Sequence, residues 1–158
     1  MCKDKRIKSI VWSIILPGLA QLLNKKVIKG SILIAFKFLI DVKTNLSGVI
    51  FLSFQGEIEE AIKITNYPWL LFYPCLYFFA MWDAFKDAGG GKGRYSFLPF
   101  VFCAYFVTVG CMYSSHVRLF GILFGPVWLP ILFVVPGVVT GVLLDKFITS
   151  LDKKSNVS

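Results

Sequence analysis

Two ionisable residues, Lys37 and Asp41, stand four positions apart inside an apolar run, residues 30–55. On a helix, residues with this spacing lie on one face, so the two side chains can form an ion pair. A charge inside a membrane costs about 2.5–3.5 kcal/mol, which demands a partner or water. The spacing therefore predicts an intramembrane polar pair that serves either the fold alone or a transport path or partner contact. A loop at residues 41–45, which would place Asp41 in water, is the alternative.

The other residues that could act in catalysis or bind a ligand show no recognisable active-site motif in the sequence. His116 follows Ser114 and Ser115, but a hydrolase would also need an orienting carboxylate and an oxyanion hole. The glycine-rich segment 89–94 holds Lys92 but lacks the Walker A spacing and the following Ser or Thr, so a flexible cytoplasmic linker is favoured. The four cysteines show no C-x-x-C spacing. We therefore expect no enzyme activity, no metal and no cofactor.

The composition is typical of a membrane protein. Of 158 residues, 56% are hydrophobic and 16% are aromatic, too many for a soluble domain to cover with polar side chains. At this length the chain has room for a single transmembrane domain, residues 1–158. The net charge of +8 indicates cytoplasmic loops that face anionic lipid headgroups, and we expect no binding to nucleic acid. The expected headgroup contacts are Lys25, Lys26, Lys29, Lys92 and Arg94.

The apolar runs predict an all-α integral membrane protein with four crossings, at residues 30–55, 67–85, 96–113 and 119–144. The first is expected as one long tilted helix, because either half of it would be too short to cross. Three prolines in the last run predict kinks or a broken segment. Residues 55–66 are acidic with apolar side chains at helical spacing, which predicts a short surface helix outside the membrane.

The distribution of Lys and Arg orients these crossings, with both termini on the cytoplasmic side of the membrane. Thirteen of these residues then lie at cytoplasmic ends and two, Lys63 and Arg118, lie outside. Residues 7–23 complicate this arrangement, because a crossing there would carry the lysines that follow to the outside. We therefore expect a re-entrant or interfacial helix, bent at Pro17 and Gly18. A spanning segment, which would give six crossings, and a cleaved secretory signal are the alternatives.

Two short motifs carry a resemblance to known proteins. Residues 16–21 read LPGLAQ, and residues 81–88 read MWDAFKDA. They resemble the Pro-Gly-x-Gly-Gln motif and the later Trp-Asp-Ala-Phe/Tyr helix ending of a group of small polytopic bacterial inner-membrane proteins of unassigned function. The resemblance covers residues 10–90 and implies a location but no reaction; Ala20 replaces the second glycine of the motif, and Leu23 stands where an aromatic residue is usual. The motif positions are Pro17, Gly18, Gln21 and Asp83.

The absence of a catalytic constellation and the short length favour a non-catalytic accessory or assembly subunit of a membrane complex. Its partners would be anionic lipid and either another membrane protein or further copies of the same chain. The alternative is a small oligomeric transporter or channel that uses Lys37 and Asp41. An enzyme acting on lipid headgroups would have to combine Asp83, Asp87 and His116, which the expected topology places on opposite sides of the membrane.

Overall fold

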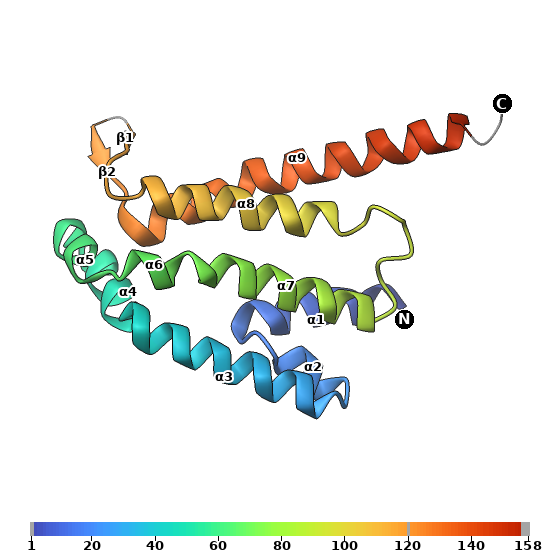
Figure 1. The fold of residues 1–158 in the computed structure, drawn as a ribbon, viewed down its shortest axis with the longest axis horizontal. Coiled ribbons are helices and arrows are strands. Elements are labelled where there is room, and N and C mark those ends of the chain that lie inside the picture. The colour runs from blue at the N-terminus through green and yellow to red at the C-terminus, as the bar shows by residue number, and fades with distance from the viewer. Residues whose placement is uncertain (1, 120, 156–158) are drawn as a thin grey trace.

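Helices make up nearly all of the computed structural model, which describes residues 2–119 and 121–155; residues 1, 120 and 156–158 lie outside the described part. In chain order the elements are α1 (Cys2–Ile15), α2 (Leu19–Leu23), α3 (Val27–Thr44), α4 (Leu46–Gln55), α5 (Ile58–Ile64), α6 (Tyr67–Leu70), α7 (Phe72–Asp87), α8 (Leu98–Tyr113), β1 (Arg118–Leu119), β2 (Ile122–Leu123) and α9 (Gly125–Ser155). The two strands pair as one short antiparallel hairpin. The prediction of an all-α fold is therefore confirmed (Figure 1).

The N-terminal segment forms a hairpin of two helices. α1 ends at Ile15, and the chain turns through residues 16–18 before α2 begins. Gly18 makes this turn with φ 102°, in the left-handed region that favours glycine. α2 then runs back toward the end of the molecule where α1 starts (Figure 1). The bend expected at Pro17 and Gly18 is thus present.

Residues 30–55 form two helices, so the prediction of one long tilted helix is wrong. α3 ends at Thr44 and α4 begins at Leu46. Asn45, between them, has φ 59°, a left-handed conformation that asparagine adopts more readily than most side chains. The predicted alternative, a loop over residues 41–45, is also wrong, because α3 continues through Thr44 and the chain changes direction at a single residue.

From α5 onward the expected elements are present with shifted ends. α5 is the expected short helix, α6 and α7 together cover residues 67–85, and α8 covers most of residues 96–113. The last helix begins only at Gly125, because the β-hairpin occupies the residues before it, and it extends to the end of the described residues. It runs through Pro130 and Pro136 without a break. Of the two expected effects of the prolines, the broken segment is therefore wrong, and the kinks stay a prediction.

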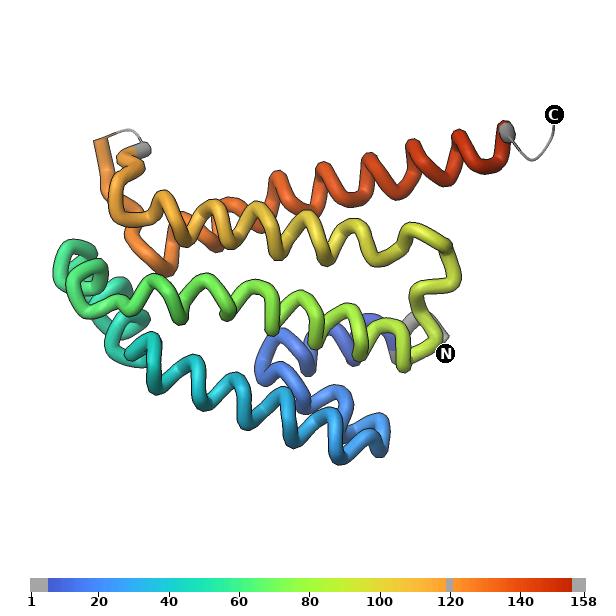
Figure 2. Tube along the Cα trace, in the orientation of Figure 1, coloured from blue at the N-terminus to red at the C-terminus, as the bar shows by residue number. Residues whose placement is uncertain are grey.

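The helices run between two ends of the molecule (Figure 2). One, the terminal end, holds the start of α1, the α2–α3 connection, the α7–α8 loop and the end of α9; the other, the α5 end, holds α4, α5 and the β-hairpin. Four helical passes connect them: α3, α6 with α7, α8, and α9. α7 lies between two flanks, since α1, α2 and α3 pack on one side of it and α8, followed by α9, packs on the other.

Glycines shape the contact between α8 and α9, the most extensive helix pair in the described part of the chain. A Cβ atom on Gly141 would lie 2.4 Å from the Cα of Pro99, and one on Gly137 would lie 2.8 Å from the Cα of Cys103. Gly110 makes a similar close approach from α8. Because Gly137 and Gly141 are four residues apart, they form the small-xxx-small pattern that lets two helix backbones meet.

Among the described residues, one helix is long and apolar enough to cross a membrane by itself, residues Gly125–Lys154 of α9. Helix length and composition therefore support one of the four expected crossings; α4 and α8 are apolar but shorter. Large apolar side chains of α9 are exposed, including Val135 at 65% and Phe147 at 62%. The core helix of a soluble protein would bury such side chains, so the surface of α9 suits an apolar surrounding.

Candidate functional site

A cluster of five polar side chains lies at the terminal end and is named here the polar clamp. Gln21 comes from α2, Lys29 from α3, Asp83 and Asp87 from α7, and Lys26 from the connection before α3. Gln21 Nε2 donates hydrogen bonds to the Ala80 carbonyl oxygen at 2.9 Å and to Asp83 Oδ2 at 3.2 Å. Lys29 Nζ donates to Asp83 Oδ1 at 2.9 Å, and Lys26 forms an ion pair with Asp87. The clamp thus ties the N-terminal hairpin and the start of α3 to the last turns of α7.

Two glycines bring the backbones of the hairpin and α3 together beside the clamp. A Cβ atom on Gly18 would lie 2.5 Å from the Gly30 carbonyl oxygen, and one on Gly30 would lie 2.8 Å from the Gly18 carbonyl oxygen. Any larger residue at either position would force these backbones apart. Gln21 follows Gly18 in the first turn of α2, and its side chain is fully buried. Gly18 and Gly30 therefore position the Gln21 amide against α7.

The motif positions lie close together in space. Gln21 and Asp83 are in direct contact although 62 residues separate them. Pro17 and Gly18 form the turn before α2 and so act on Gln21 through the backbone. The sequence pattern did not predict the ion pairs of the clamp, and the available signal was that lysines follow the first motif while aspartates belong to the second.

The clamp combines enclosed carboxylates with more open ammonium groups. The side chains of Asp83 and Asp87 are 15% and 11% exposed, whereas those of Lys26 and Lys29 are about half exposed. The hydrogen bond from Lys29 to Asp83, followed by the attraction between their charges, raises the pKa of Lys29. Gln21 Oε1 and Asp87 Oδ2 are buried and accept no hydrogen bond from the described residues. The clamp therefore retains hydrogen-bonding capacity beyond its internal contacts.

Lys37 and Asp41 form an ion pair along one face of α3, and their side chains are 19% and 14% exposed. In the described part of the chain, Asp41 Oδ1 is buried without a hydrogen-bond partner. α3 packs against α7, where the Tyr73 hydroxyl donates a hydrogen bond to the Tyr77 oxygen at 3.0 Å. The ion pair on α3 and the tyrosine pair on the neighbouring α7 are named here together the polar strip.

The five expected headgroup contacts all belong to segments at the terminal end. Lys26 and Lys29 direct their ammonium groups to the clamp carboxylates. Lys25 precedes α3, and Lys92 and Arg94 belong to the α7–α8 loop; all three side chains are exposed. The basic surface of this end is therefore built from two lysines that also hold the fold and three residues that face outward.

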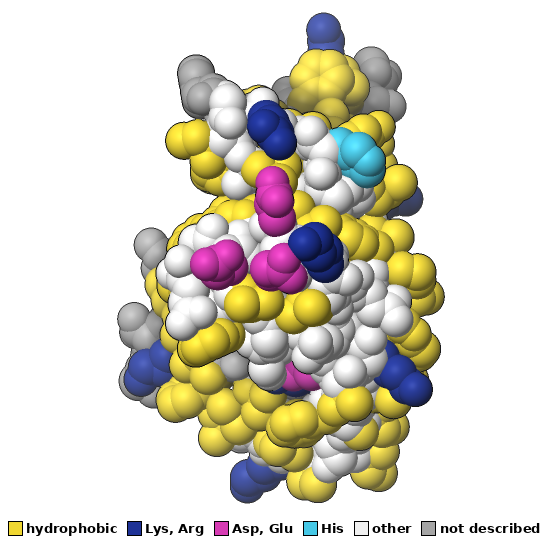
Figure 3. Space-filling model, turned by 90° about the vertical axis from the view of Figure 1, so that its left-hand side faces the viewer, with side chains coloured by type: hydrophobic (Ala, Val, Ile, Leu, Met, Phe, Trp, Pro, Cys, Tyr) yellow, Lys and Arg dark blue, Asp and Glu magenta, His cyan; other side chains and the backbone are white. Residues whose placement is uncertain are grey.

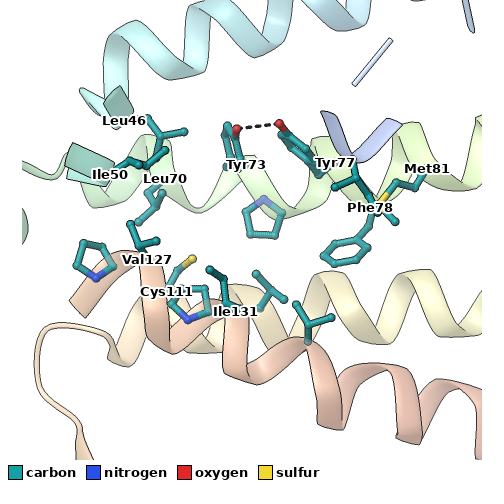
Figure 4. A pocket seen from close by; sticks show the side chains of 16 residues that line it. Leu46, Ile50, Leu70, Tyr73, Tyr77, Phe78, Met81, Cys111, Val127 and Ile131 are labelled. Carbon is teal, nitrogen blue, oxygen red and sulfur yellow. Dashed lines mark hydrogen bonds between the residues drawn. The ribbon is translucent and has the colours of Figure 1, made fainter. Parts of the chain in front are cut away.

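An apolar cavity of about 440 Å³ lies beside α7 (Figure 4). Its wall comes from α1, α4, α6, α7, α8 and α9. Tyr73 and Tyr77 contribute the phenol groups, which are hydrogen-bonded to each other. Ile14, in the last turn of α1, lines the cavity, and the α1–α2 hairpin covers only the part of α7 nearer the terminal end. The hairpin thus ends where the cavity begins.

The α5 end carries exposed acidic side chains, Glu57, Glu59 and Glu60, which gather on one face with basic side chains and the histidine nearby (Figure 3). Ser115 Oγ and His116 Nδ1 lie 2.7 Å apart in the connection between α8 and β1. Among the side chains that the structure describes, those of residues 6–118 and 121–154, no group of three or more His, Cys, Asp or Glu could hold a metal ion.

The polar clamp, the polar strip and the cavity all border α7, which makes this helix the centre of the candidate site. The resemblance expected from the two motifs stays a prediction. In comparisons with known proteins, no family model, no curated protein and no solved structure matches the chain.

Proposed function

We propose that this chain is an integral protein of the bacterial cytoplasmic membrane and that it works as a non-catalytic accessory or assembly subunit of a membrane complex. In this proposal, four passes cross the bilayer: α3 with α4 at its outer end, α6 with α7, α8, and α9. The α1–α2 hairpin enters from the cytoplasm and returns to it. The terminal end, with both termini, faces the cytoplasm.

The observation that carries the membrane setting is the apolar surface of all four passes. Soluble proteins rarely expose contiguous apolar patches larger than a few hundred Å², whereas lipid makes such a surface favourable. The 16-residue helices α7 and α8 reach about 24 Å each, so the bilayer would thin slightly around them. Exposed side chains on the passes include Phe36, Phe38, Phe51, Phe72, Phe79, Val101, Tyr105, Val135 and Leu143.

The charges at the two ends support the orientation. The terminal end carries the expected headgroup contacts, and α5 and its N-cap at the other end carry Glu57, Glu59 and Glu60. Lys and Arg accumulate on the cytoplasmic side of membrane proteins, which assigns the terminal end to the cytoplasm. The return of α2 toward this end also supports a re-entrant hairpin over the alternative of six crossings.

The internal pairing of polar side chains supports an accessory role. The clamp residues bond to one another across helices, and Lys37 bonds to Asp41. The clamp therefore stabilises the arrangement of the helices, and the ion pair within α3 neutralises two charges. A protein that is mostly scaffold fits a role in assembling or stabilising a larger complex, where its exposed apolar passes would contact another membrane protein.

Topology reporters test the membrane arrangement. A reporter fused after Lys26 should give a cytoplasmic signal, as should one after Arg94, whereas one after Asn66 should give an external signal. An external signal after Lys26 would show that residues 7–23 span the membrane and would contradict the re-entrant hairpin.

Purification in a mild detergent, followed by mass analysis, tests the accessory role. We expect a second, different chain to co-purify in fixed stoichiometry. A homo-oligomer with no further chain would contradict this expectation and favour the second candidate function.

The second candidate is a small oligomeric transporter or channel, and the polar strip is the observation that favours it. α3 carries a mostly buried ion pair in which one carboxylate oxygen has no partner among the described residues, and the neighbouring α7 carries two phenols. Ionisable groups inside a membrane often mark ion pathways. The test is a flux assay for H⁺ or Na⁺ in vesicles that contain the purified protein. If the double variant Lys37→Met with Asp41→Leu keeps its stability but loses a flux seen in the parent protein, the transporter assignment is supported. A parent protein without flux contradicts it.

A further inference from the structure

We propose that the apolar cavity holds one acyl chain of an anionic phospholipid whose phosphate group lies against Arg6 and Lys8 on α1. This inference rests on the membrane setting proposed above. It assigns a ligand class to the cavity and a cationic contact to the N-terminal helix.

The side chains that line the cavity favour a hydrocarbon ligand. Aliphatic, aromatic, proline and sulfur-containing side chains form the wall, and the two phenol groups bond to each other. A ligand therefore needs no hydrogen-bonding group inside the cavity. Water is disfavoured there because a buried water molecule needs two to four polar partners. The volume of about 440 Å³ lies within the range of about 300–1,000 Å³ that is typical of ligand sites.

The cavity opens sideways, toward the surrounding lipid. Three of its lining residues are also exposed at the surface: Ile14 at 54%, Ile50 at 40% and Ile131 at 54%. They belong to α1, α4 and α9, so the opening lies among these three helices. In the proposed membrane setting the medium outside this opening is the hydrocarbon of the bilayer, which supplies acyl chains at high concentration.

An exposed apolar stripe on α1 leads from the opening to two cations. Ile7, Val11 and Ile14 follow one another at spacings of four and three, and all three side chains are about half exposed. Arg6 and Lys8 flank this stripe near the start of α1, about 9–12 Å from Ile14 along the helix. The start of α1 lies at the terminal end (Figure 1). Lys8 is exposed, and Arg6 Nε is buried without a hydrogen-bond partner among the described residues. Cations beside an apolar path suit a phosphate group attached to an acyl chain.

The length of the cavity is close to the hydrocarbon thickness of one leaflet. Along α6 and α7 the lining runs from Leu70 to Met81, a rise of about 16 Å. Half of the hydrocarbon thickness of a typical bilayer is about 15 Å. A chain that enters from the terminal end beside α1 can therefore lie along the cavity without being folded.

Photolabelling tests the site. The probe is phosphatidylglycerol with a photoactivatable diazirine near the end of one acyl chain, in vesicles of phosphatidylcholine that contain the purified full-length protein. Mass analysis of peptides should find label on Tyr73, Tyr77 and Met81. Ile131→Trp, a change at the exposed rim, should lower this label strongly, whereas Val135→Trp, one turn further on α9, should not. Val135 is exposed and does not line the cavity, so it is a matched control.

The headgroup contact is tested by removing the two positive charges on α1 and by changing the headgroup of the labelled lipid. Arg6→Gln together with Lys8→Gln should lower cavity labelling by about fivefold for each charge removed. The same diazirine on phosphatidylcholine should label the cavity weakly in the parent protein and in the variant. Equal labelling by the two lipids would overturn the assignment of an anionic lipid.

Label on exposed side chains of α9, such as Val139 and Leu143, reports contact with lipid independently of the cavity. If these residues are labelled and the cavity residues are not, the inference is overturned while the membrane setting stands. If Ile131→Trp leaves cavity labelling unchanged, the assigned opening is wrong and the inference is also overturned. If neither set is labelled, the membrane setting itself is contradicted.

Discussion

The two flanks of α7 are held together by different physical means. On one flank, the N-terminal hairpin and the start of α3 are joined to α7 by the hydrogen bonds and ion pairs of the polar clamp, and the polar strip lies further along α3 and α7. On the other flank, α9 packs on α8 through glycines that bring the backbones together, and aromatic rings of α7 meet Phe97 and Phe100. One flank depends on directional polar contacts and the other depends on close packing.

Helix length explains this difference. In a membrane, lipid tails are as apolar as leucine, so helices associate through packing or hydrogen bonds. α8 and α9 run side by side over many turns, and small residues along that length provide enough contact. The α1–α2 hairpin covers only part of α7, and a few polar bonds fix its position. Four predictions test this contrast, in order of decreasing effect.

The largest effect is expected at Asp41. Asp41→Asn leaves Lys37 as a charge without its counterion at a mostly buried position, which costs about 3–5 kcal/mol. Thermal or denaturant unfolding of the protein in detergent micelles measures the loss.

The control is the double variant Lys37→Met with Asp41→Leu, which removes both charges and should recover most of the stability. If Asp41→Asn unfolds like the parent protein, Asp41 is in contact with water, and the polar strip does not stabilise this flank.

On the flank where α9 packs on α8, adding a single methyl group at a glycine should lower the stability of the protein. Gly141→Ala places a methyl group 2.4 Å from a backbone atom of Pro99, so α8 and α9 must separate, at a cost of about 1–3 kcal/mol. Gly93→Ala is the matched control, because its methyl group would meet nothing closer than 3.8 Å. Equal unfolding temperatures for the two variants would show that backbone contact does not hold this flank together.

Substitutions in the polar clamp should lower stability by less, and the losses at Gln21 and Asp83 should depend on each other. Gln21→Leu removes the hydrogen bonds to Ala80 and Asp83 but also removes a buried oxygen without a partner, so a net loss of about 0.5–1.5 kcal/mol is expected. A double-mutant cycle with Asp83→Asn should give a coupling energy of at least about 0.5 kcal/mol. Additive effects would show that the two side chains do not stabilise each other.

The ion pair between Lys26 and Asp87 should contribute least. Lys26 is 44% exposed, so Lys26→Gln should cost less than about 1 kcal/mol at low salt. At about 1 M salt, where charges are screened beyond about 3 Å, the difference from the parent protein should shrink. Lys25→Gln is the control, since no ion pair involves Lys25 in the described part of the chain. A larger loss that does not depend on salt would place Lys26 in a packing role.

Sequence patterns predict the helices better than their ends and contacts. The long apolar runs predict helices because apolar character is a property of each segment. The break at Asn45 was missed because one left-handed residue changes direction without altering the hydrophobic pattern. The continuity of α9 through Pro130 was missed because neighbouring groups can satisfy the carbonyls that proline leaves free.

The site was predictable only in part. Lys37 and Asp41 are close in the chain, so their spacing on a helix already suggests the contact. The contact of Gln21 with Asp83 depends on how distant helices pack, and one sequence carries no record of that. The spacing of Gly137 and Gly141 was readable in the sequence, but only the structure shows that this face is covered by α8.

The separation of 62 residues between Gln21 and Asp83 also sets an order of events during synthesis. A ribosome adds about 5–20 residues per second, so about 3–12 seconds pass between the appearance of Gln21 and that of Asp83. Throughout this interval the hairpin exists without the helix that holds it in place. Its final position is therefore acquired late, and any factor that receives the emerging chain meets the N-terminal hairpin before the clamp can form.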